Sequence, residues 1–153
     1  MNTDLLKSHA KSFYWASFFL SKETYSKCSN LYNFCRTLDD IADSSEKLER
    51  KRKNFSKFKN NFVKKSFDNL VVKSMWQVID EENISEKVVL DLFDGIETDL
   101  NANVKINSKK ELLIYSYRVA GTVGLMMSKI LKVTDKESLK GAIDLGVAMQ
   151  LTN

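Results

Sequence analysis

Five side chains able to bind charged ligands lie within residues 31–43, a segment that is otherwise apolar. In a helix, side chains three or four positions apart share one face, so these residues form a single polar stripe. Asp39 and Asp43 lie one turn apart and can point to the same place, and Arg36 is the cation within the stripe. Carboxylates held this close repel each other unless a cation lies between them, so the stripe is either a solvated face or a metal site. Its members are Tyr32, Arg36, Asp39 or Asp40, and Asp43.

The composition of the chain favours long helices. It has 153 residues, enough for one domain with a substantial core, and it contains no proline and only five glycines. Such a sequence suits uninterrupted helices better than a turn-rich β fold, and we therefore predict an all-α protein.

The charge pattern argues against a nucleic-acid partner. The 24 lysines and arginines are spread along the chain and largely matched by 20 acidic residues, which leaves a net charge of +4. A solvated exterior is the favoured interpretation of this excess, and an anionic substrate or a peripheral membrane contact is the alternative.

The cysteines and the N-terminus favour a cytoplasmic protein. Cys28 and Cys35 are seven residues apart, about 10 Å along a helix, which is too far for a disulfide. Residues 1–4 lack the pattern of a signal peptide, and no stretch approaches the ~18 apolar residues of a membrane span. With no cluster of cysteine and histidine, a zinc site is disfavoured.

Capping patterns predict where several helices begin. Ser21 is expected to cap a helix that runs through the polar stripe to about Ala42. Capping boxes that start at Ser108 and Thr134 each open an apolar helix.

Two further patterns each leave a choice between packing and ligand binding. Four phenylalanines among lysines predict an amphipathic helix that rests either on a membrane surface or, as we favour, on the core. Gly121 and Gly124 lie inside a predicted helix, where each costs about 1 kcal/mol relative to alanine, so a neighbouring helix or a ligand is expected to approach them closely. The phenylalanines are Phe55, Phe58, Phe62 and Phe67.

Four segments spread over the chain match, in order, the motifs of one enzyme family. Residues 11–16 (Lys-Ser-Phe-Tyr-Trp-Ala) are similar to its N-terminal Ser-Phe motif, and residues 31–43, ending in Asp-Asp-Ile-Ala-Asp, are similar to its first aspartate-rich motif. Residues 115–124 resemble its Val-Ala-Gly-x-Val-Gly helix, and residues 146–153 resemble the start of its second aspartate-rich helix. The family is that of the squalene/phytoene synthases, head-to-head prenyl diphosphate synthases with the all-α isoprenoid-synthase fold. Residues 94–100 resemble a further family segment less specifically.

The resemblance implies a metal and diphosphate site. Asp39, Asp40 and Asp43 would bind Mg²⁺, with Mn²⁺ as an alternative, and the metal would assist departure of the diphosphate. The residues implied for substrate binding are Lys11, Ser12, Tyr32, Arg36, Val119, Ala120, Gly124, Gln150 and Asn153. Those implied for catalysis are Arg36, Tyr115 and Gln150.

The resemblance also implies an activity, for which three alternatives stay open. The first is a prenyltransferase that condenses two geranylgeranyl diphosphates to phytoene through prephytoene diphosphate in carotenoid biosynthesis. The residues of the motifs are most similar to those of bacterial members of this branch. The second is a squalene or hydroxysqualene synthase that uses farnesyl diphosphate, with NADPH required only for squalene. The third is a catalytically silent assembly protein, which the intact acidic stripe disfavours.

The resemblance departs from the family pattern chiefly at its end. The family's second motif continues past its asparagine to an arginine and two aspartates, whereas this sequence stops at Asn153. We therefore expect residues 1–153 to be the N-terminal portion of a single synthase domain, from a truncated reading frame. We expect no turnover from these residues alone.

Overall fold

The computed structural model describes residues 15, 17–101 and 105–152, and this part of the chain is helical and contains no strand. The all-α prediction is therefore confirmed. None of the described helices is long and apolar enough to cross a bilayer. The elements are a 3₁₀ turn η1 (Ser17–Phe19), α3 (Lys22–Asp43), α4 (Leu48–Val63), α5 (Leu70–Glu82), α6 (Glu86–Asp99), α7 (Lys109–Ser116), the π-helical turn η2 (Tyr117–Gly121), α8 (Thr122–Ile130) and α9 (Lys136–Thr152).

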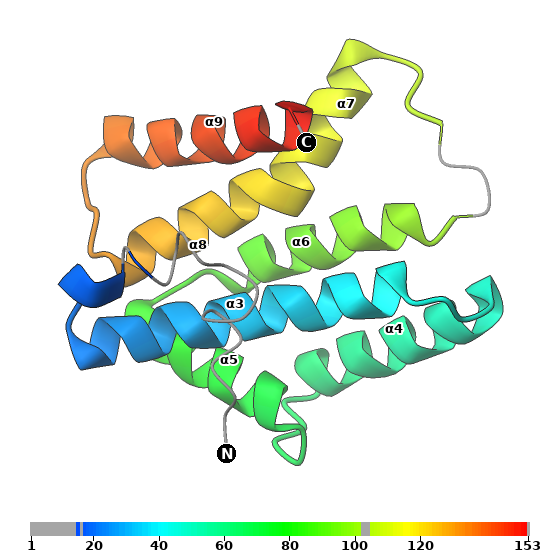
Figure 1. Cartoon of the computed structure of the whole chain (residues 1–153), viewed down its shortest axis with the longest axis horizontal. Coiled ribbons are helices and arrows are strands. Elements are labelled where there is room, and N and C mark those ends of the chain that lie inside the picture. The colour runs from blue at the N-terminus through cyan, green and yellow to red at the C-terminus, as the bar shows by residue number, and fades with distance from the viewer. Residues whose placement is uncertain (1–14, 16, 102–104, 153) are drawn as a thin grey trace.

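The helices form stacked layers (Figure 1). α3 and α6 lie in the middle, α4 and α5 pack against α3 from below, and α7, η2 and α8 run as one bent rod above them. α9 covers this rod from the outside and contacts α7, η2 and α8. The last helix therefore rests on one layer only, and none of its side chains is buried.

Aromatic side chains from three helices form the centre of the core. Phe34 of α3 is fully buried, and its ring centroid lies 5.6 Å from Phe58 and Phe62 of α4 and 5.7 Å from Phe93 of α6. The prediction that the phenylalanine stripe packs on the core is confirmed for Phe55, Phe58 and Phe62. It is wrong for Phe67, which lies between α4 and α5 and keeps 49% of its surface exposed.

Side-chain caps begin four of the described helices, including α5, where the Asn69 side chain accepts hydrogen bonds from the amides of Val71 and Val72. The Ser21 hydroxyl accepts a hydrogen bond from the Thr24 amide at 3.1 Å, and α3 extends one residue beyond the predicted Ala42. Ser108 likewise accepts from the Glu111 amide. At α9 the predicted cap was wrong by one residue, because Asp135, and not Thr134, accepts from the amide of Ser138 at 2.9 Å.

The glycines of α8 and α9 allow two helix backbones to touch. A Cβ on Gly124 would lie 2.3 Å from the carbonyl oxygen of Ala142, and one on Gly146 would lie 2.5 Å from that of Ala120. At Gly121, Ile143 and Val147 of α9 come close. Of the two explanations that the sequence left open for Gly121 and Gly124, the neighbouring helix accounts for both.

Candidate functional site

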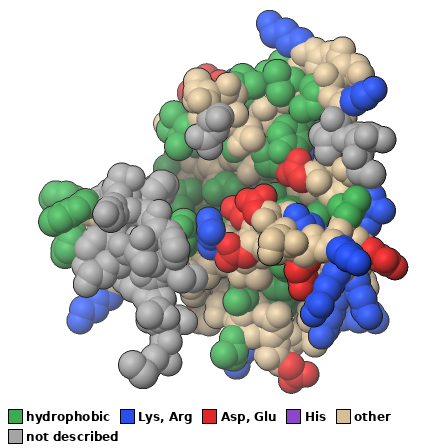
Figure 2. Space-filling model, turned by 45° about the vertical axis from the view of Figure 1, so that its right-hand side comes forward, with side chains coloured by type: hydrophobic (Ala, Val, Ile, Leu, Met, Phe, Trp, Pro, Cys, Tyr) green, Lys and Arg blue, Asp and Glu red, His purple; other side chains and the backbone are tan. Residues whose placement is uncertain are grey.

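The polar stripe of α3 forms as the helical spacing predicts. The opposite face of the helix buries Leu31, Phe34 and Leu38 in the core, which fixes the rotation of the helix. The stripe is thereby held at the edge of the core, where Asp39 is half-buried and Asp43 is exposed. A group of acidic side chains is visible near the middle of the face shown in Figure 2, beside a hollow lined by apolar side chains.

Arg36 neutralises only part of the stripe. Its Nη2 atom lies 2.8 Å from Oδ1 of Asp40, one turn along α3, and the two side chains are 42% and 59% exposed. Asp40 therefore points toward the arginine side of the stripe. Arg36 still favours the charged form of Asp39, although it does not cancel the repulsion there.

Asp99 joins the stripe from the end of α6, although sequence reasoning did not select it. Its Oδ2 atom accepts a hydrogen bond from the hydroxyl of Tyr115 on α7 at 3.1 Å. Partial burial of the carboxyl group raises the pKa of Asp99, the hydrogen bond from Tyr115 lowers it, and the charge of Asp43 raises it again. Side chains from the consecutive helices α6 and α7 therefore lie close to the stripe of α3, which is distant from both in the sequence.

The resulting cluster, Asp39, Asp43, Asp99 and Tyr115, has surplus negative charge. Burial raises the pKa of Asp39 most, and the charges of Asp43, Asp40 and Asp99 raise it further against the opposing effect of Arg36. Burial and the hydrogen bond to Asp99 also raise the pKa of Tyr115. The phenol therefore stays protonated at neutral pH, and the carboxylates lack a full complement of cations.

This cluster fits a hard divalent cation. Carboxylate oxygens are the ligands that Mg²⁺ prefers, and Mg²⁺ usually takes only one or two from the protein, completing its shell with water and phosphate oxygens. The three aspartates do not converge to within 4.8 Å of one another, as a closed protein cage would require. Their spacing and surplus charge suit a metal that is shared with a phosphate ligand.

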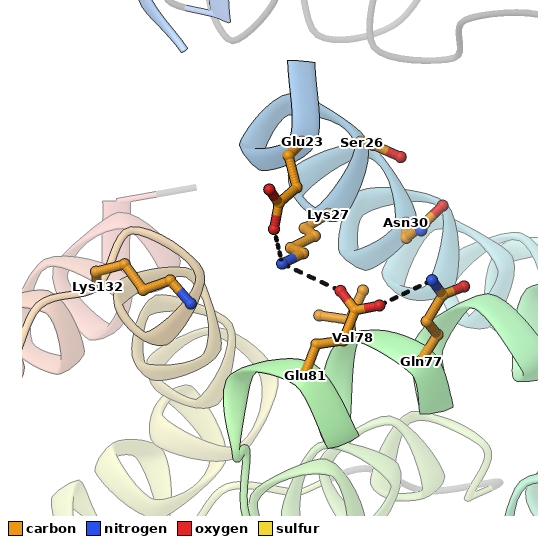
Figure 3. A pocket seen from close by; sticks show the side chains of 8 residues that line it. All are labelled: Glu23, Ser26, Lys27, Asn30, Gln77, Val78, Glu81 and Lys132. Carbon is orange, nitrogen blue, oxygen red and sulfur yellow. Dashed lines mark hydrogen bonds and ion pairs between the residues drawn. The ribbon is translucent and has the colours of Figure 1, made fainter. Parts of the chain in front are cut away.

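A second acidic cluster is already neutralised. In the described part of the chain, one group of three carboxylates does converge within 4.8 Å, namely Glu23, Glu81 and Glu82. The Lys27 ammonium lies between them, 2.5, 3.1 and 2.7 Å from their oxygens respectively. Figure 3 shows this lysine reaching from α3 toward α5 at the edge of an open cavity of about 570 Å³. Because a lysine ammonium occupies its centre, this cluster is a network of ion pairs between helices.

The other predicted site residues fall into three groups. Tyr32 lies on the same face of α3 as Arg36 and is half-buried. Those on the α7–α9 layer make helix contacts: Val119 lies against Gly95 of α6, Ala120 and Gly124 approach α9, and Gln150 is half-buried on α9. Lys11, Ser12 and Asn153 lie outside the described residues.

Comparison with known proteins defines the class of this helical chain. The profile of the squalene/phytoene synthase family matches residues 6–153. The chain therefore belongs to the squalene/phytoene synthase family.

Individual relatives agree with this assignment. Phytoene synthase from Thermus thermophilus is 31% identical over 97% of this chain and 51% of its own length, and phytoene synthase from Pseudescherichia vulneris is 29% identical over 99% and 52%. Presqualene diphosphate synthase from Sinorhizobium fredii is 26% identical over 95% and 55%. The chain thus spans about half the length of these relatives.

A solved structure shares the fold. Squalene synthase HpnC from Alicyclobacillus acidocaldarius superposes with a TM-score of 0.78 at 19% identity, covering 95% of this chain and 56% of that one. The helical layers described above therefore correspond to part of an isoprenoid-synthase fold.

Proposed function

We propose that this chain is the part of a transferase that carries the first aspartate-rich motif, and that this transferase condenses two prenyl diphosphates head to head. The observation that supports this most directly is the cluster Asp39, Asp43, Asp99 and Tyr115, in which surplus carboxylate charge faces a protonated phenol. Membership of the squalene/phytoene synthase family supplies the reaction class.

In this proposal, Asp39 and Asp43 hold Mg²⁺ and Asp40 keeps Arg36 oriented through their ion pair. Mg²⁺, when bound, stabilises the negative charge that develops on the departing diphosphate. Arg36 donates charge-assisted hydrogen bonds to the diphosphate oxygens, and Tyr32 lies one turn away on the same face. Lys11 and Ser12 are proposed to add donors to the same group.

Tyr115 has the clearest role near the reacting carbons. Its hydroxyl hydrogen is held on Oη by the Asp99 hydrogen bond, so the side chain is a fixed, protonated wall of the site. On the layer of α7, η2, α8 and α9, we propose that Val119, Ala120, Gly124 and Gln150 shape the channel for the isoprenoid tails. Gly124 does so indirectly, by letting α9 approach.

Two products are candidates for the reaction. We favour phytoene from geranylgeranyl diphosphate, in carotenoid biosynthesis, because several of the similar proteins are named phytoene synthase. A presqualene or squalene product from farnesyl diphosphate is the second candidate, since one relative is named presqualene diphosphate synthase. NADPH enters only if squalene is formed.

Ligand binding tests the proposal without requiring turnover. Binding of geranylgeranyl thiodiphosphate, measured by calorimetry with and without Mg²⁺, should depend on the metal and weaken about tenfold or more in Asp39→Asn and Asp43→Asn. Asp80→Asn, which removes an exposed carboxylate on α5, is the control and should bind normally. Equal binding by all four proteins would contradict the proposed site. Extending the chain with the second half of the Thermus thermophilus relative and identifying the hydrocarbon would then choose the product.

A further inference from the structure

The outer face of α4 presents a row of basic side chains. Phe55, Phe58 and Phe62 are buried in the core, so the rotation of the helix is fixed and its opposite face is turned to solvent. Residues spaced three, four and seven positions apart follow one line along that face. They form the basic row, whose members are all exposed: Arg50, Lys53, Lys57 and Lys64.

The basic row is poorly neutralised by the rest of the protein. Arg50 pairs with Glu46 at 2.9 Å. Among the described residues, no carboxylate lies within ion-pair distance of Lys53, Lys57 or Lys64, whereas Lys59 on the other side of α4 is paired with α6. Like charges one turn apart on a helix repel each other, so the row is an unfavourable arrangement for this helix by itself.

The charge of the chain is strongly segregated around this helix. Residues 47–65 contain nine lysines or arginines and one glutamate, while the whole chain has a net charge of only +4. The remainder of the chain is therefore net negative. Lys51, Arg52 and Lys59 bond to oxygens of α3 or of α6 and its C-terminal end, whereas the basic row faces solvent. Such a surface attracts a polyanion over a wide area.

Exposed apolar side chains lie directly beyond the end of the row. Val63, Phe67 and Leu70 keep 50%, 49% and 74% of their surfaces exposed around the turn that joins α4 to α5. Figure 1 shows this turn projecting from the lower edge of the molecule. Apolar side chains beside lysines match the two parts of a lipid interface, anionic headgroups and hydrocarbon.

We propose that α4 docks this protein on an anionic lipid bilayer, with the basic row against the headgroups and Val63, Phe67 and Leu70 inserted at one end. The choice of a bilayer rests in part on the proposed function, because prenyl substrates and hydrocarbon products dissolve in membranes. Nucleic acid would use the row but has no partner for the aliphatic Val63 and Leu70. The phenylalanines buried in the core take no part.

Vesicle sedimentation with the whole chain tests this surface. Vesicles of phosphatidylcholine mixed with phosphatidylglycerol should bind the protein, vesicles of phosphatidylcholine alone should bind weakly, and salt should reduce binding. The triple variant Lys53→Glu, Lys57→Glu, Lys64→Glu should bind the anionic vesicles more weakly. The loss of affinity should be at least about fivefold per lysine, the factor for one basic residue at an anionic surface. The control Lys73→Glu, Lys110→Glu, Lys136→Glu changes net charge equally at exposed positions elsewhere and should keep most of the binding.

A second pair of variants tests the apolar end. Phe67→Ser with Leu70→Ser should weaken binding to the anionic vesicles, whereas Ile106→Ser with Leu131→Ser, also at exposed positions, should not. Circular dichroism checks that each variant is folded.

Four outcomes would overturn the proposal: no vesicle binding, equal loss in both charge variants, no effect of the apolar pair, or tighter binding to duplex RNA than to vesicles at equal phosphate concentration. None of these measurements needs turnover, so loss of diphosphate binding with intact vesicle binding would count against the proposed function only.

Discussion

Tyr115 on α7 donates a hydrogen bond to Asp99 at the end of α6, with 3.1 Å between the oxygens. This contact joins two helices whose connecting segment includes residues outside the described part of the chain. It also places a carboxylate next to the acidic stripe of α3, where Asp99 and Asp43 raise each other's electrostatic energy.

Asp99→Asn should therefore weaken metal binding without lowering the stability of the metal-free protein. Removing its charge relieves repulsion with Asp43 while an amide oxygen still accepts from Tyr115, so the free energy of unfolding without metal should stay equal or rise by less than about 1 kcal/mol, because these partly exposed charges are screened. Stabilisation by added Mg²⁺, measured in the same urea titrations, should fall. Asp80→Asn should change neither quantity, and a large loss of stability in Asp99→Asn without metal would contradict this account.

Phe34→Ala should be among the most damaging single changes in the core. Phe34 is fully buried and touches the rings of Phe58, Phe62 and Phe93. Removing it leaves a cavity between three helices, and the free energy of unfolding should fall by about 3–5 kcal/mol. The comparison is Phe67→Ala, at a half-exposed position, for which chemical denaturation should show a change below about 1 kcal/mol.

Gly124→Ala should weaken the contact between α8 and α9. The new Cβ would lie 2.3 Å from the Ala142 carbonyl oxygen, a backbone atom that moves only with the helix. We expect a loss of about 1–3 kcal/mol by urea denaturation, with faster amide exchange in α9. Gly141→Ala is the matched control, because nothing lies within 4 Å of its Cβ position and alanine is favoured in a helix. It should stabilise the protein slightly, and the opposite order would refute the packing explanation.

The network of ion pairs around Lys27 should make the stability of the fold sensitive to acid. Hydrogen bonds from Lys132, and then from Lys27, hold the pKa of Glu82 below its usual value. A carboxylate whose pKa is lower in the folded state contributes its stability above its unfolded pKa, about 4.3, and that contribution is lost as the pH falls. Glu82→Gln should lower Tm by about 5 °C or more at pH 7 and flatten the decline of Tm below about pH 4.5. Glu86→Gln, at an exposed position in the first turn of α6, should follow the wild-type curve.

Local patterns in the sequence predicted the helices and half of the candidate site. Ser21 and Ser108 form the predicted caps because capping needs only residues within one turn, and the stripe of α3 follows from helical spacing alone. Local spacing does not select Asp99, because its position beside the stripe depends on how α6 packs on α3 and on the hydrogen bond from Tyr115 of α7. The cap at Thr134 was wrong because α9 begins at Lys136, so that Asp135 is the residue directly before the helix and accepts from the Ser138 amide.

The π-helical turn Tyr117–Gly121 sets the phase of the rod formed by α7 and α8. A π turn contains one residue more than a regular helix would, and each residue advances a helix by about 100°. Tyr115 and Gly124, which lie on opposite sides of that turn, can therefore face α6 and α9 respectively. Deleting one residue from the turn would restore a regular helix but rotate Tyr115 about the helix axis relative to Gly124, so that only one of the two could keep its partner.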